Sequence, residues 1–120
     1  MKPIVAIRVD ICTNATVQDV SLDSIENDFP VTWRHIAGIN ETTANTLTQI
    51  GWKRGRTFYP IHGAAPAALG RDVRIMSAAT VPGNFKPTAR FYGATAGDSL
   101  VLVAIGEVYQ EPPLPAISEL

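Results

Sequence analysis

The most informative segment of the sequence is SLVLVAIGEVYQ, residues 99–110. Apolar side chains occupy both alternate sets of positions as far as Ile105, and several of them are β-branched. This composition predicts a strand covered on both faces, in the middle of a sheet. Residues 88–92 predict another strand just before it. The two glycines and the aspartate of residues 93–98 favour a hairpin-like connection between these two strands.

Further strands are predicted upstream by alternation of side chains along the chain. The clearest is at residues 3–11, where alternate positions form an apolar face, as is typical of a half-buried strand; the side chains of this face are Val5, Ile7, Val9 and Ile11. Weaker patterns predict strands at residues 16–22, 31–36 (ended by Gly38), 56–61 (closed by Pro60) and 73–81, and a mixture of strand and loop at residues 40–50.

The strand pattern predicts the fold class. About seven or eight short strands, separated by turn residues at intervals of about 8–12 residues, are typical of an all-β sandwich or barrel. We predict a β-sandwich of jelly-roll type as a single domain over residues 1–111, although the spacing does not separate a sandwich from a barrel. Residues 112–120 are rich in proline, which cannot donate ladder hydrogen bonds, and predict an extended C-terminal tail.

Several classes of function lack their usual residues in this sequence. The longest nearly uninterrupted apolar run is far shorter than a membrane-spanning helix, so we expect no membrane partner. The single cysteine, Cys12, excludes an internal disulfide and a multi-cysteine metal site. His35 and His62 have no metal-like spacing, and no nucleophile elbow, phosphate loop or dinucleotide fingerprint is present. We therefore expect no metal, no cofactor and no enzymatic activity.

The charges are unevenly distributed, although the formal net charge is only −1. A basic middle stretch, residues 34–90, lies between two acidic ends. Its most distinctive part is GWKRGRTFY at residues 51–59, where three cations lie between three aromatic residues, a composition found on surfaces that bind single-stranded nucleic acid. The chain has no overall positive excess, so we do not expect nucleic acid as its main partner. A small β-barrel that binds nucleic acid or sugar through residues 52–59 remains the alternative.

The overall character of the chain resembles the small decoration, or cement, proteins of tailed-phage heads. The shared features are a single domain, threonine- and alanine-rich strands, no signal peptide, one cysteine and a proline-rich tail. The resemblance implies a non-enzymatic virion protein, made in the host cytoplasm, that trimerises over the joints of the major capsid protein lattice and stabilises the shell.

Such a protein would need arms and a docking face. We expect the arms at residues 1–11 and 108–120, which an ordinary first strand and a free tail explain equally well. The residues expected to bind the partner are Trp52, Lys53, Arg54, Arg56, Arg71, Arg74, Pro112, Pro113 and Leu114. An enzyme with a pocket near His35 or His62 is the third and least favoured hypothesis.

Overall fold

The computed structural model describes residues 2–22, 29–65, 71–75 and 77–108, which form nine β-strands and no helix. The all-β class predicted from the sequence is confirmed. No helix in these ranges is long and apolar enough to span a membrane. Pro112, Pro113, Leu114 and the rest of the predicted tail lie outside the described residues. The strands are β1 (Lys2–Ile11), β2 (Val17–Ser21), β3 (Val31–Asn40), β4 (Leu47–Arg54), β5 (Thr57–Ala64), β6 (Asp72–Arg74), β7 (Ala79–Val81), β8 (Lys86–Tyr92) and β9 (Ser99–Val108).

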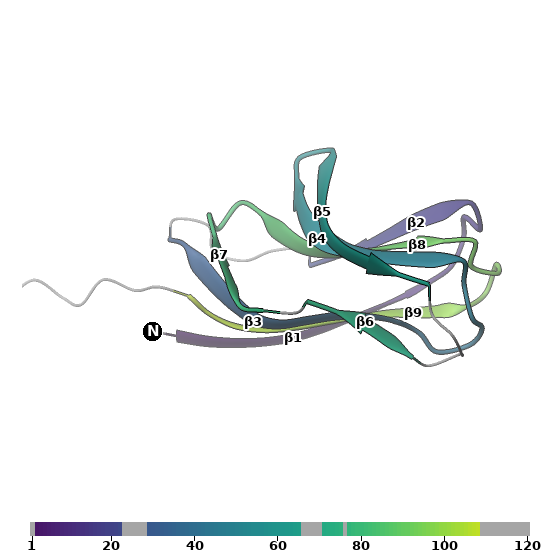
Figure 1. The fold of residues 1–120 in the computed structure, drawn as a ribbon, viewed down its shortest axis with the longest axis horizontal. Coiled ribbons are helices and arrows are strands. Elements are labelled where there is room, and N and C mark those ends of the chain that lie inside the picture. The colour runs from purple at the N-terminus through teal and green to yellow at the C-terminus, as the bar shows by residue number, and fades with distance from the viewer. Residues whose placement is uncertain (1, 23–28, 66–70, 76, 109–120) are drawn as a thin grey trace, which may run out of the picture.

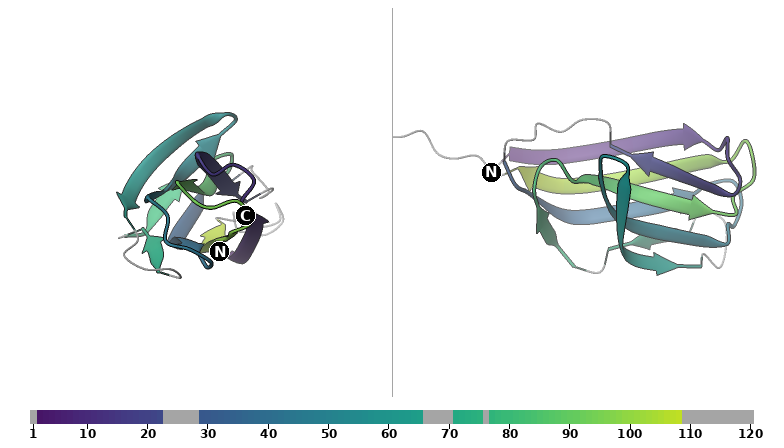
Figure 2. Two further views of the ribbon diagram at one scale, coloured as in Figure 1. Left: turned by 90° about the vertical axis from the view of Figure 1, so that its right-hand side faces the viewer. Right: turned by 90° about the horizontal axis from the view of Figure 1, so that it is seen from above.

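The strands form two antiparallel sheets that pack face to face as a sandwich (Figure 1). The five-stranded sheet has the order β1-β9-β3-β6, and β7 also pairs with β3. The four-stranded sheet has the order β2-β8-β4-β5. Figure 2 shows the strands running along the length of the molecule, with β1 beside β9. The central position predicted for β9 is confirmed, because β1 and β3 pair with its two edges.

The connection at residues 93–98 differs from the prediction of a hairpin. It joins β8 to β9, which lie in different sheets, so it crosses from one layer to the other. The loop is held against the end of β1: the Cys12 N–H donates to the Asp98 carbonyl at 2.8 Å, and the Gly97 N–H donates to the Cys12 carbonyl at 2.9 Å. A hairpin is excluded because both edges of β9 are already paired.

Three predicted strand limits are corrected by the structure. Gly38 does not end its strand, since β3 continues to Asn40; a Cβ at Gly38 would lie 2.8 Å from the Cβ of Ala89, so the glycine allows the two sheets to approach. The predicted strand at residues 73–81 is divided into β6 and β7, which pair with different parts of β3. Pro60 lies inside β5 and does not close it, because an edge strand tolerates a missing N–H.

The core lies between the sheets. Its largest fully buried apolar side chains are Trp33, Phe91, Ile36, Ile50, Leu100 and Leu102. Gly106 makes room for the Trp33 indole, since a Cβ at this glycine would lie 2.8 Å from the ring. The pairing with β9 decides which side chains of β1 face the core. Paired residues in an antiparallel ladder point to the same side of the sheet, and Arg8 pairs with the buried Leu102. The side chains of β1 that face outward are therefore those of Val5, Ile7, Val9 and Ile11.

Candidate functional site

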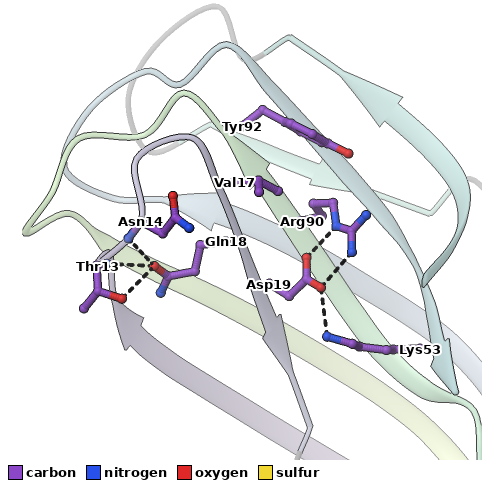
Figure 3. A pocket seen from close by; sticks show the side chains of 8 residues that line it. All are labelled: Thr13, Asn14, Val17, Gln18, Asp19, Lys53, Arg90 and Tyr92. Carbon is purple, nitrogen blue, oxygen red and sulfur yellow. Dashed lines mark hydrogen bonds and ion pairs between the residues drawn. The ribbon is translucent and has the colours of Figure 1, made fainter. Parts of the chain in front are cut away.

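A hollow of about 490 Å³ lies on the four-stranded sheet, bounded by β2, β4, β8 and the loop after β1 (Figure 3). It is open to solvent, and most of the residues that line it have polar side chains. The rim is rigid on one side, because the Gln18 side-chain oxygen accepts the N–H groups of Thr13 at 2.7 Å and Asn14 at 3.1 Å. The lining residues are Thr13, Asn14, Val17, Gln18, Asp19, Lys53, Arg90 and Tyr92.

Asp19 binds both cations of the hollow. Its carboxylate accepts hydrogen bonds from Arg90 at 2.6 and 2.9 Å and from Lys53 at 2.9 Å. Burial raises the pKa of Asp19, but the hydrogen bonds and charges of Arg90 and Lys53 outweigh burial and hold that pKa below its ordinary value. The bond to Asp19 also raises the pKa of Arg90, whose guanidinium lies 4.4 Å from the centre of the Phe58 ring. The carboxylate and the two cations therefore stabilise one another's charged forms.

The lowered pKa of Asp19 predicts an acid-dependent loss of stability. A carboxyl group whose pKa is lower in the folded than in the unfolded chain stabilises the fold above its unfolded pKa, near the ordinary value of 3.8. This contribution is lost as the pH falls through the lower folded pKa. Urea unfolding of the wild type and of Asp19→Asn, at pH values above and below 3.8, measures it. The variant should lose less stability on acidification than the wild type; equal losses would contradict the prediction.

The predicted basic–aromatic segment lies at the β4–β5 hairpin, which projects from the sandwich (Figure 1). Trp52 is only 6% exposed and belongs to the core, so its indole is not displayed on the surface. Lys53 is bound to Asp19, and the Arg54 guanidinium lies 5.7 Å from the centre of the Phe85 ring. Arg56 is exposed at the hairpin tip.

The other predicted docking cations lie in the opposite layer. Arg71 precedes β6 and is exposed, whereas Arg74 lies on β6, with its guanidinium 3.9 Å from the carboxylate of Asp72. The structure therefore places the predicted cations in two groups on different sheets and does not bring them together on one face. Their binding to a partner stays a prediction.

An exposed apolar surface was missed by the sequence prediction. The side chains of β1 that alternate outward are exposed by 53–72%, and β9 adds Ile105 at 40%, opposite Val5 in the ladder. We call this surface the apolar row; it consists of Val5, Ile7, Val9, Ile11 and Ile105. The sequence contained the signal, namely the alternation in residues 3–11. Which side of β1 faces out, however, depends on its register with β9.

The described residues contain no group of three or more histidine, cysteine or acidic side chains that could hold a metal ion. His35 lies on β3 and His62 on β5, in different sheets. Comparison of the chain with protein-family models, curated proteins and solved structures gave no significant match.

Proposed function

We propose that the chain is a non-enzymatic structural protein that works inside a protein assembly, as a subunit that decorates and stabilises a phage capsid. The observation that supports this function is the exposed apolar row on the outer side of the five-stranded sheet. Its five side chains expose on the order of 500 Å² of apolar surface, which is as much as the largest patch of a typical monomer, and such patches mark contact sites. An assembly that covers the row gains the hydrophobic free energy of burying it.

The strand pairing supports a jelly-roll form of the sandwich. The strand pairs are nested along the sequence, from the outermost pair to the innermost. These pairs are β1 with β9, β2 with β8, β3 with β6, and β4 with β5. A long antiparallel hairpin rolled into two sheets has this nested order. Jelly rolls are frequent in viral capsid proteins, which agrees with the resemblance to phage decoration proteins.

We propose that the chain has no enzymatic role because the two cationic side chains of the hollow both form ion pairs with Asp19. Lys53 and Arg90 are both bound to Asp19, and the two cations lower the pKa of its carboxyl group. A general acid or base instead needs a pKa near the working pH and a free route to a substrate proton. A structural protein needs neither, so the ion pairs serve to fix β2, β4 and β8 together.

The proposed function is tested with capsids that lack the decoration protein. The purified chain is added to such shells from the phage that encodes it and is sedimented with them. We expect cosedimentation and a higher temperature of shell disruption. We expect weaker retention for Ile7→Lys, which places a charge in the apolar row, than for Ile61→Lys on β5, where the replaced isoleucine is also half exposed. A protein that stays in the supernatant under all salt conditions would overturn the proposal.

A second candidate is the binding of nucleic acid or sugar at the β4–β5 hairpin, which the exposed Arg54, Arg56 and Tyr59 favour. Nucleic-acid binding predicts salt-dependent retention on a phosphate matrix that is lost when Lys53, Arg54 and Arg56 are replaced by alanine. Because Lys53 is bound to Asp19 and Trp52 is buried, we expect both the wild type and the triple alanine variant to elute at low salt. Strong retention of the wild type alone would favour this second function.

A further inference from the structure

We infer that the apolar row is the contact surface for a second copy of this chain, packed face to face against the same row. This inference rests on the proposed assembly function and names the partner of that surface. It concerns the outer side of the five-stranded sheet, where β1 is an edge strand and β9 its neighbour. The row follows β1 from Val5 to Ile11, and we expect the contact to extend along this whole part of the strand.

The row is large enough to form the apolar centre of a dimer interface. A standard protein interface buries about 800 Å² on each partner, with an apolar centre and a polar rim. The row provides on the order of 500 Å² of exposed apolar surface, which is more than half of one side. The rim is present as well, since on the outward side of the β1–β9 ladder Glu107 lies at one end and Ser99 at the other.

The charge pattern favours a second copy over a charged partner. From Val5 to Ile11 the outward side of β1 carries no charge, and the paired positions of β9 are also apolar. These positions are Val101, which is only 5% exposed, Val103 and Ile105. Arg8 and Asp10 are on the opposite side of β1 and are paired with each other at 3.0 Å. A neutral face offers nothing to a basic or acidic partner, but two copies of it meet without like-charge repulsion.

The geometry of strands also suits self-association. The outward side chains of a strand form a flat surface, and two sheet faces pack about 10 Å apart with nearly aligned strands. A two-fold axis needs only one such patch, because the same surface is used by both copies. The assembly should therefore contain an even number of copies, in contrast to the trimer that the resemblance to decoration proteins implies.

The test is the molar mass in solution, measured by sedimentation equilibrium and light scattering over a wide range of concentrations. We expect the full-length protein to form dimers. Ile7→Lys puts two lysines into the centre of the contact and should raise the dissociation constant at least about a hundredfold. Ile61→Lys makes the same change on the other sheet and should leave the dissociation constant unchanged. Thermal unfolding of both variants is the control for folding. We expect both to be folded, because the two replaced isoleucines are at least half exposed.

Other outcomes overturn the inference in recognisable ways. A wild-type protein that is monomeric at all concentrations excludes the second copy. If Ile7→Lys nevertheless loses binding to capsid shells, the row contacts the shell itself and only the proposed function stands. A trimer unaffected by Ile7→Lys places the subunit contact elsewhere. A dimer that Ile7→Lys dissociates, in a protein that never binds shells, supports the inference and overturns the proposed function.

Discussion

Replacing Trp33 with alanine is expected to lower the free energy of unfolding by about 4 kcal/mol, a large part of the total stability of a domain this size. The indole belongs to β3 and is the largest fully buried side chain of the described residues. It also fills the space left by Gly106 on β9, where a Cβ would lie 2.8 Å from the ring. Its removal leaves a cavity between the sheets that the paired strands on both sides of β3 cannot close.

The matched control for this substitution is Trp33→Phe. The Trp33 indole N–H is buried without a hydrogen-bond partner among the described residues, so phenylalanine removes an unsatisfied donor while keeping most of the ring. We expect a smaller loss of stability for this variant than for Trp33→Ala. Urea unfolding followed by circular dichroism measures both. Equal losses would show that the ring does not fill the core as described.

Replacing Asp98 with alanine should cost about 3 kcal/mol of stability, because one buried and two partly buried hydrogen bonds lose their charged acceptor. The Asp98 carboxylate is almost completely buried and accepts hydrogen bonds from Thr43 at 2.5 Å, Asn40 at 3.0 Å and the Thr95 N–H at 2.9 Å. Burial raises the pKa of Asp98, but these bonds outweigh it and keep the pKa below its ordinary value. The residue thereby joins the crossing loop after β8 to the loop after β3.

Asp10→Ala is the comparison for Asp98→Ala. Asp10 is partly exposed and pairs with Arg8, and exposed ion pairs contribute at most about 1 kcal/mol. Chemical denaturation of the two variants at neutral pH should therefore show a clearly larger loss for Asp98→Ala. A loss of similar size in both would mean that the buried network around Asp98 adds nothing beyond an ordinary surface carboxylate.

The fold class could be predicted from local patterns, whereas the layer of each strand could not. The apolar run in residues 99–110 predicted the central strand β9 because a strand covered on both faces has few polar side chains. The hairpin predicted at residues 93–98 was wrong, because the glycines and aspartate that allow a tight turn also allow a crossing between sheets. What distinguishes the crossing from a hairpin is hydrogen bonding between residues far apart in the sequence. The backbone bonds of Cys12 with Gly97 and Asp98 are an example, and no local pattern predicts them.

The candidate surfaces were harder to predict for the same reason. The alternation of Val5, Ile7, Val9 and Ile11 was visible, but their exposure follows from the pairing of Arg8 with Leu102 on β9. Conversely, Trp52 sits in a basic segment that looks like a binding surface, and its ring packs into the core. Charge composition could not reveal that Asp19, from the acidic first third of the sequence, binds Lys53 and Arg90.

The pairing of Lys2 with Val108 also has a mechanical consequence. The beginning of β1 and the end of β9 lie side by side at one end of the sandwich, so a force pulling them apart acts on one hydrogen-bonded pair at a time. Such a load unzips the ladder from that end, whereas a load along the strands would strain all the pairs together. Tension along the strands is therefore carried better by this ladder than tension that pulls its two paired ends apart.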